Sequence, residues 1–221
     1  TAPITVTVDN TAPTGSVSVN GGAAATNNRN VTLTLAASDA LTGVTQMRFS
    51  NTGTSFSAGE AFSTTKAWTL TTGAGTKTVY VQFGDGAGNW SASFTDTIVL
   101  DTTAPTVSAR TVTNVTANSA TVNWTTNEPA TTQVEYGLTT SYGLLTTLDP
   151  ALITAHSVLL AGLAPGTTYN YRVRSVDAAG NQTISANGTF ATAAGADTVA
   201  PSVPTGLATT PVSTTQINLT W

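Results

Sequence analysis

The sequence predicts an all-β chain of tandem β-sandwiches, and three observations carry this prediction. Threonine makes up about a fifth of the 221 residues and charged residues only 8%, so the residues that build amphipathic helices are scarce. Many short segments alternate apolar and polar residues, as half-buried strands do. A five-residue motif recurs at the spacing of a whole sandwich domain. We therefore expect strands throughout and almost no helix.

The recurring motif has the form Asp-x-x-Ala-Pro and occurs at residues 9–13, 101–105 and 197–201. Its copies begin 92 and 96 residues apart. Each proline fixes its own φ and pushes the preceding alanine toward extended geometry. We expect these junctions to be short, semi-rigid spacers that hold consecutive domains in a roughly linear arrangement.

The domain boundaries follow from the junctions. Residues 4–8 resemble residues 97–100, which end at the second junction, and residues 216–221 resemble residues 120–124. We therefore expect the closing strand of a preceding domain at 1–9, two sandwiches at 10–101 and 102–194, and a linker with the first strands of a further, incomplete sandwich at 195–221.

A second pair of similar segments, residues 85–89 and 177–181, predicts hairpin loops. Each segment begins with an aspartate that can cap the turn through its side chain. Each also contains glycine and asparagine, which accept the positive φ of hairpin connections. In the first repeat, the alternating segments 78–83 and 94–100 then form the last two strands of the domain.

In the second repeat, residues 163–173 read LAPGTTYNYRV. This Leu-x-Pro-Gly-Thr-x-Tyr run, followed by alternating tyrosine and valine, resembles fibronectin type III domains. The resemblance implies that Tyr169 forms the tyrosine corner, with its ring in the core and its hydroxyl bonded to upstream backbone. It also implies that Trp124 is the core tryptophan of the second strand, and that residues 195–221 begin another such domain.

Two further segments of the second repeat are VEYGLTTSYG at residues 134–143 and His-Ser-Val at 156–158. They resemble the fibronectin-like domain that precedes the catalytic domain of purple acid phosphatases. The resemblance implies no catalysis here, because the metal ligands of those enzymes belong to a separate domain.

Alternating segments of the first repeat lie at residues 31–35, 46–51, 66–70 and 77–83. They resemble bacterial Ig-like modules, as in large bacterial or archaeal surface proteins. Together the resemblances cover nearly the whole chain. They predict the fold better than the function, because such sandwiches serve as spacers, adhesive units and enzyme accessories.

Composition excludes several classes of function. The net charge is -4 and the seven Lys and Arg are scattered, so nucleic acid is not an expected partner. The absence of cysteine excludes disulfides and thiolate metal sites. No apolar run approaches the roughly 20 residues that cross a bilayer. The expected partners are the neighbouring domains of the same chain.

The residues offer no complete catalytic set, so we do not expect an enzyme. The only histidine, His156, begins an alternating segment and is interpreted as a structural residue that bonds local backbone. The few glutamates lack a visible partner for glycoside hydrolysis. Trp68 and Trp124 lie in alternating segments and are expected in the core, whereas Trp90 follows a hairpin loop and is the one candidate for stacking on a sugar.

Acidic residues recur at one pole of each predicted sandwich. In an Ig-like sandwich the incoming linker, the loop between strands two and three, and the loop between strands six and seven meet there. The residues at these positions are Asp9, Asp39 and Asp85 in the first domain, and Asp101, Glu128 and Asp177 in the second. With Asn89 and backbone carbonyls, such a set could hold Ca²⁺, which takes six to eight oxygens, and lock neighbouring domains together. The alternative is that each aspartate merely caps its turn.

These observations predict a non-catalytic structural or adhesive segment of a large secreted protein, located at the cell surface or associated with a filament. The alternative is an accessory spacer or carbohydrate-binding region of a secreted multi-domain hydrolase. Weakly charged, threonine-rich edge strands lack the Lys and Pro that block strand association, and we therefore hypothesise self-association into a fibre or sheath. Surface glycans are a further candidate partner.

Overall fold

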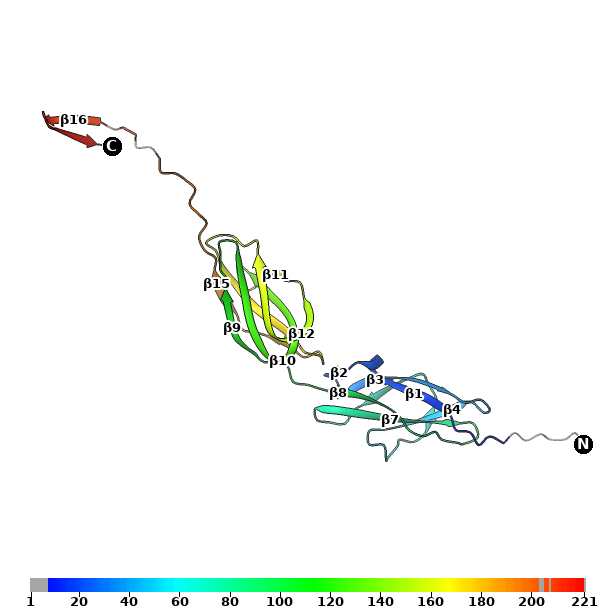
Figure 1. Ribbon diagram of the computed structural model, residues 1–221. Helices are drawn as coiled ribbons and strands as arrows, with labels where there is room; N and C mark the ends of the chain where they lie inside the picture. The colour runs from blue at the N-terminus through cyan, green and yellow to red at the C-terminus, as the bar shows by residue number, and fades with distance from the viewer. Residues whose placement is uncertain (1–7, 203–204, 207, 221) are drawn as a thin grey trace, which may run out of the picture.

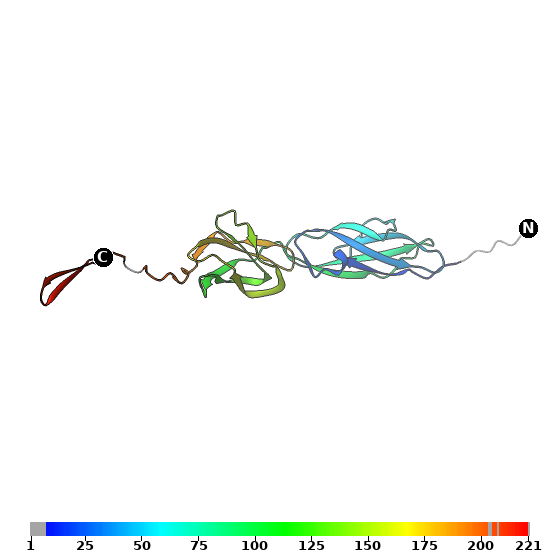
Figure 2. The ribbon, with the colours of Figure 1, turned by 90° about the horizontal axis from the view of Figure 1, so that it is seen from above.

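The computed structural model describes residues 8–202, 205–206 and 208–220. Two β-sandwiches lie end to end, and an extended linker leads from the second to a terminal hairpin (Figure 1). Figure 2 shows the same linear order from above. Most of the closing strand expected at residues 1–9 lies outside the described residues, as does Trp221.

The first sandwich packs a three-stranded sheet of order β1-β3-β6 on a five-stranded sheet of order β2-β8-β7-β4-β5. Strand pairing is antiparallel except between β2 and β8, which are parallel. The strands are β1 (Thr14–Val19), β2 (Ala25–Thr26), β3 (Asn30–Ser38), β4 (Val44–Ser50), β5 (Glu60–Ala61), β6 (Thr65–Thr69), β7 (Gly75–Asp85) and β8 (Phe94–Leu100).

The alternation of β3 shows how the first core forms. Val31, Leu33 and Leu35 are buried, while the threonines between them are exposed. These side chains join one apolar core between the two sheets. Trp68 packs against that core as expected, with its ring centroid 5.4 Å from that of Phe49. Truncating a buried leucine of this kind to alanine costs about 2–5 kcal/mol.

The second sandwich is built around one long strand, β10 (Ser119–Gly137), which runs through both sheets. The strands of this sandwich, besides β10, are β9 (Val107–Thr113), β11 (Leu144–Leu145), β12 (Asp149–Ala161), β13 (Thr168–Val176), β14 (Gln182–Ile184) and β15 (Gly188–Ala191). The first half of β10 pairs with β9 and β12, and its second half pairs mainly with β11 and β13, although β12 also reaches Ala130 and Thr132. A register shift between Thr125 and Ala130 bends β10 without ending it, so the strand extends well beyond the 120–124 segment that the sequence singled out.

The second core contains the two aromatic residues that the sequence placed there. Trp124 is buried, and its Nε1–H donates to Ser175 Oγ at 3.1 Å. Tyr169 is buried, and its hydroxyl accepts the backbone N–H of Ala164 at 2.9 Å. This is the tyrosine corner, and it fixes the turn before β13 to the core.

His156 differs from its expected role. It lies within β12 rather than at the start of a strand, and it is 3% exposed. Its ring stacks on Trp124 at 4.8 Å, and its two nitrogens pair with the hydroxyls of Thr126 and Thr132 rather than with backbone. Burial lowers the pKa of His156 below its usual value, while the charge of Asp149 acts in the opposite direction. His156 is thus a buried core residue.

The remaining elements are small. Within the described residues the only helical segment is a 3-10 turn, η1 (Asn20–Gly22), and no helix there is long and apolar enough to cross a membrane. The terminal hairpin pairs β16 (Ala208–Ser213) with β17 (Gln216–Thr220), where the sequence predicted the first strands of a further sandwich.

Candidate site at the domain junctions

The two predicted hairpin loops have the same hydrogen bonds. Asp85 Oδ1 accepts the backbone N–H groups two and four residues further on, at 2.9 and 2.8 Å. Asp177 Oδ1 accepts the equivalent groups at 2.8 and 2.9 Å. In each loop the side-chain amide of Asn89 or Asn181 donates to the other carboxylate oxygen at 2.8 Å. The aspartates therefore cap their turns, as the sequence predicted.

Glycine alone provides the positive φ of these loops. Gly88 has φ 95° and Gly180 has φ 92°, whereas neither asparagine has positive φ. The sequence had given that role to asparagine as well. The asparagine side chains bond the loop aspartate instead, which needs no left-handed backbone.

The same asparagines tie the incoming linker to the domain. Asn89 Nδ2–H donates to the carbonyl of Asp9, and Asn181 Nδ2–H donates to the carbonyl of Asp101, each at 3.0 Å and each across 80 residues. We call these two sets junction clamps: the first is Asp9, Asp85 and Asn89, and the second is Asp101, Asp177 and Asn181. Each clamp fixes where the chain enters its sandwich.

The second junction clamp also reaches the first domain. The backbone N–H of Asp101 donates to the carbonyl of Thr26 at 3.0 Å, while its own carbonyl accepts Asn181. A side-chain carbon placed at Gly180 would lie 3.6 Å from Asn27 Nδ2, so the second hairpin loop lies against the first sandwich. Asp101 is therefore hydrogen-bonded to both domains at once.

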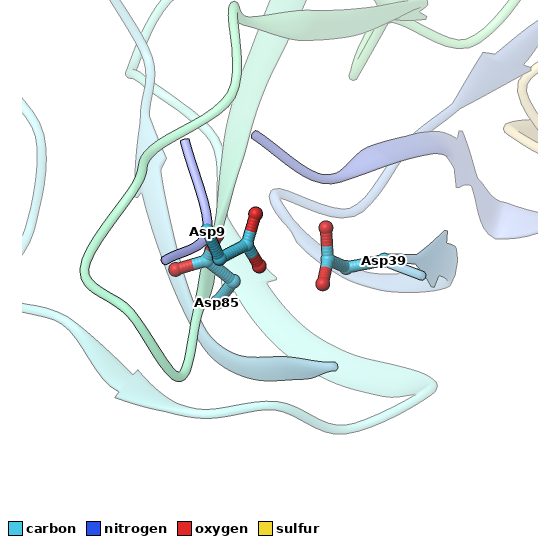
Figure 3. Close-up of side chains that lie close together, drawn as sticks. All are labelled: Asp9, Asp39 and Asp85. Atoms are coloured by element: carbon cyan, nitrogen blue, oxygen red, sulfur yellow. The ribbon is translucent and has the colours of Figure 1, made fainter. Parts of the chain in front are cut away.

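The acidic residues of the first domain converge beside the first clamp. Asp9, Asp39 and Asp85 each offer a carboxylate oxygen within 4.8 Å of the other two. Figure 3 shows Asp9 and Asp85 side by side, with Asp39 facing them. Asp9 is buried, and its two oxygens accept the N–H of Thr11 at 3.0 Å and the hydroxyl of Thr42 at 2.8 Å. No sequence pattern predicted the Thr42 contact, since threonine occurs throughout the chain.

Most carboxylate oxygens of this first cluster already accept hydrogen bonds. Asp39 Oδ1 accepts three consecutive backbone N–H groups, from residues 41–43, at 2.9–3.1 Å. Burial acts to raise the pKa of Asp85, but the hydrogen bonds from Asn89 and from the loop backbone hold that pKa below its usual value. The protein itself thus stabilises the negative charges of Asp39 and Asp85.

The second domain holds its acidic residues in the same arrangement but supports them less. Asp101, Glu128 and Asp177 also offer carboxylate oxygens within 4.8 Å of one another. Asp101 Oδ1 accepts the N–H of Thr103 at 2.9 Å, whereas no hydrogen bond from the described residues reaches the carboxylate of Glu128. Burial, and then the charges of Asp101 and Asp177, raise the pKa of Glu128 above its usual value.

These donor sets fit a hard divalent cation in chemical type. Carboxylate and carbonyl oxygens are the ligands of Ca²⁺ and Mg²⁺. Three carboxylates supply at least three of the roughly six to eight oxygens that Ca²⁺ takes. In the first cluster the turn-capping alternative accounts for the aspartates through their hydrogen bonds. In the second cluster the repulsion at Glu128 is left uncompensated. Calcium at either junction stays a prediction.

Trp90, the tryptophan singled out for sugar stacking, is largely covered. The guanidinium of Arg48 lies 4.2 Å from its ring centroid. Added side-chain carbons at Gly84 and Gly59 would approach the ring to 3.1 and 3.3 Å, so backbone packs closely against it as well. Trp90 therefore packs on the sheet and does not present a free face.

Comparison with known proteins adds to this geometry. The family model of the purple acid phosphatase N-terminal domain matches residues 105–192. The chain is similar to chitinase A1 of Niallia circulans, 38% identical over 127 residues, covering 55% of this chain and 17% of that protein. It is also similar to exoglucanase B of Cellulomonas fimi, 34% identical over 236 residues, covering 98% of this chain and 20% of that protein.

A third relative, endoglucanase B of Cellulomonas fimi, is 41% identical over 111 residues, which is 48% of this chain and 10% of that protein. The chain thus spans a fifth or less of the relatives it matches. Among solved structures, the chicken CNTN1 FN1-FN3 domains align with a TM-score of 0.50 at 17% identity, covering 81% of this chain and 67% of that one. At this identity the likeness shows the fold alone.

The topology and the comparisons therefore agree on the architecture. The chain is all-β, and its solved neighbours are fibronectin type III arrays. The resemblance seen in residues 134–143 and 156–158 is confirmed by the family model. Residues 105–192, which are less than half of the chain, are similar to the domain described as the N-terminal domain of purple acid phosphatases.

Proposed function

We propose that this chain is a non-catalytic accessory spacer of a secreted, multi-domain polysaccharide hydrolase. The relatives are named as a chitinase, an exoglucanase and an endoglucanase, and the matched segment covers a fifth or less of each. A non-catalytic segment of a larger enzyme fits that pattern. The relatives thus support the accessory role, which was the alternative prediction from the sequence, over a cell-surface or filament-associated role. They also support an extracellular location.

The junction clamps are the observation that carries the spacer role. Asp101 bonds the first sandwich through its N–H and the second through its carbonyl. A flexible tether would make neither bond and would behave as a coil. Two sandwiches joined through a residue that both hold would set the distance and direction between whatever precedes and whatever follows them.

The test uses the full parent protein. Residues 10–194 are replaced by a Gly/Ser linker of equal length, and hydrolysis is measured on a soluble oligosaccharide and on an insoluble polysaccharide. A spacer predicts unchanged turnover of the soluble substrate and slower attack on the insoluble one, where reach and orientation matter. The proposal would be overturned if the linker variant and the wild type hydrolysed each substrate at the same rate. A parent gene without a hydrolase domain would also overturn it.

We also propose that a divalent cation, Ca²⁺ by donor type, binds the acidic cluster of the second domain and stiffens the junction there. The support is that three carboxylates from the linker, β10 and the second hairpin loop meet within 4.8 Å. Burial and the charges of Asp101 and Asp177 also raise the pKa of Glu128, an effect that a bound cation would oppose. Calorimetric titration of the chelator-treated protein with Ca²⁺ tests this. An absence of heat, together with an unchanged melting temperature, would contradict it.

Self-association is a separate, lesser proposal, supported by one edge of the second sandwich. In the described residues β12 pairs only with β10, so its other edge is unpaired, and Leu152, Ile153 and Leu159 are exposed along it. Open apolar edges favour strand-to-strand association. Light scattering at increasing concentration should then show a rise in mass, whereas a constant monomer mass would rule the association out.

A further inference from the structure

Tyr142 has an unusual backbone, in the turn before β11. Its φ is 58°, a left-handed conformation that bulky residues rarely adopt. Its N–H donates to the carbonyl of Thr139 at 3.0 Å. Gly137 makes this turn possible, because a side-chain carbon there would lie 1.6 Å from the carbonyl oxygen of Tyr142. Such conformations persist only where surrounding structure enforces them, and they are common at binding sites.

The side chain of Tyr142 is fixed as firmly as its backbone. The guanidinium of Arg172 lies 4.5 Å from its ring centroid. The hydroxyl of Tyr142 donates to Asn187 Oδ1 at 3.2 Å, and Asn187 Nδ2–H donates in turn to Asn170 Oδ1 at 3.0 Å. The ring is therefore held in one orientation on the surface by residues from β13 and from the segment before β15.

Two hollows of different character adjoin this ring, and Tyr142, Gly143 and Leu144 line both of them. The first, of about 240 Å³, has mixed polar and apolar walls and also includes Glu135 and Arg172. The second, of about 560 Å³, is mainly apolar and also includes Leu138. Small-ligand sites commonly combine an apolar wall with a few fixed polar groups in this way.

The apolar side of this region is exposed without an evident structural reason. Leu138 is 64% exposed, Leu144 52% and Leu145 53%. These three leucines lie within four residues of Tyr142 in sequence, and Leu138 and Leu144 line the larger hollow. Grouped exposed apolar residues around a fixed aromatic ring mark a contact surface more often than a packing accident.

The charges nearby indicate what kind of ligand fits. The carboxylate of Glu135 is paired with both Arg172 and Arg174. The two arginines and the one glutamate leave one net positive charge beside the smaller hollow, whereas the larger hollow has no charged residue in its lining. A mainly apolar, uncharged hollow next to hydrogen-bonding side chains suits a neutral ligand with many hydroxyls and an apolar ring face.

From these observations we propose that Tyr142 and the two hollows beside it bind a pyranose unit of a neutral polysaccharide. The apolar face of the sugar would lie against Tyr142 and Leu144, and its hydroxyls would bond Glu135 and Arg172. The choice of a polysaccharide rests on the proposed function, whereas the location of the site rests on the geometry alone.

The test is a titration of the 221-residue chain with cellohexaose and, separately, chitohexaose, followed by amide NMR. The site predicts saturable shifts centred on residues 138–145 and 187 with at least one of the two sugars. Tyr142→Asn should weaken that binding about tenfold, which corresponds to about 1.4 kcal/mol. Asparagine tolerates the left-handed backbone, so this variant removes the ring without forcing the turn to refold.

Leu159→Thr is the matched control, because Leu159 is 64% exposed but lies on β12 and lines neither hollow. It should bind like the wild type. The assignment is wrong if neither sugar causes saturable shifts, if the shifts centre elsewhere, or if both variants weaken binding equally. Absence of sugar binding would overturn this site alone. The spacer role would fail only through the parent gene and the linker replacement.

Discussion

The two junctions of this chain have the same clamp but different acidic neighbours. In both, a loop asparagine holds the carbonyl of the linker aspartate at 3.0 Å. In the first domain one carboxylate oxygen of the third acid, Asp39, accepts three backbone N–H groups. In the second domain its counterpart is Glu128, which lacks such support and is repelled by two aspartates. The clamp is thus the shared structural element, and the third acid is where the junctions diverge.

This difference distinguishes turn capping from cation binding, which the sequence alone could not distinguish. Asp85 and Asp177 cap their turns in the same way, so only the third acid differs between the two clusters. A glutamate without hydrogen bonds costs stability when ionised, unless a cation compensates it. We therefore expect the second junction to respond to pH and to divalent cations more strongly than the first.

The largest expected effect comes from breaking the clamps. Asn89→Ala should destabilise the first domain, and Asn181→Ala the second, by about 1–3 kcal/mol each, because each change leaves a buried carboxylate oxygen and a carbonyl short of a donor. Urea denaturation, with each domain followed by its own amide exchange, measures the two losses. A loss in only one domain would show that the clamps are not equivalent.

The next effect is that of calcium. At a Ca²⁺ concentration ten times the dissociation constant, the second domain should gain about 1.4 kcal/mol and the first domain less. Scanning calorimetry of the chelated protein, with and without Ca²⁺, provides the measurement. A larger gain in stability in the first domain would contradict this prediction.

A smaller effect is expected for Glu128→Gln in metal-free buffer. Because the folded-state pKa of Glu128 is raised, its ionisation opposes folding once the pH rises through that pKa. The variant should therefore be more stable than the wild type at pH 7, by roughly 0.5 kcal/mol. The gain should vanish below the ordinary pKa of glutamate. Asp39→Asn should instead be destabilising, since three N–H groups lose a charged acceptor.

The last prediction concerns mild acid, and we give its direction only. The second domain contains His156, whose pKa burial lowers, and the first domain contains no histidine. The neutral form supports the fold, so this contribution is complete above pH 6.5 and is lost as the pH falls toward the folded-state pKa. Thermal melts between pH 7.5 and 5.5 should show the second domain weakening more than the first. If both domains lost thermal stability equally, the effect would come from groups other than His156.

Much of the fold could be predicted because it depends on local patterns. The alternation of apolar and polar residues predicted β8, and the repeated Asp-to-Asn loops predicted the hairpins. The run ending at Tyr169 predicted the tyrosine corner. The acidic residues could be grouped because sandwich topology brings linker and loops to one pole. Long-range choices could not be foreseen. The continuous β10 depends on a bulge, and the burial of His156 depends on two threonine hydroxyls that look like any others in the sequence.

The candidate sites show the same limit. Asn89 was named as a possible oxygen donor, but the clamp bond from its amide to the Asp9 carbonyl spans 80 residues and leaves no local pattern. Tyr142 was visible only as part of a family-like segment. Its left-handed backbone depends on the absence of a side chain at Gly137, five residues earlier.

The central claim is that the second junction clamp holds the two sandwiches as one stiff spacer. Small-angle X-ray scattering of the 221-residue chain tests it most directly, with wild type and Asn181→Ala measured side by side. The account predicts a narrow, elongated distance distribution for the two wild-type sandwiches and a broader, more compact one for the variant. Equally broad distributions for both proteins would contradict it.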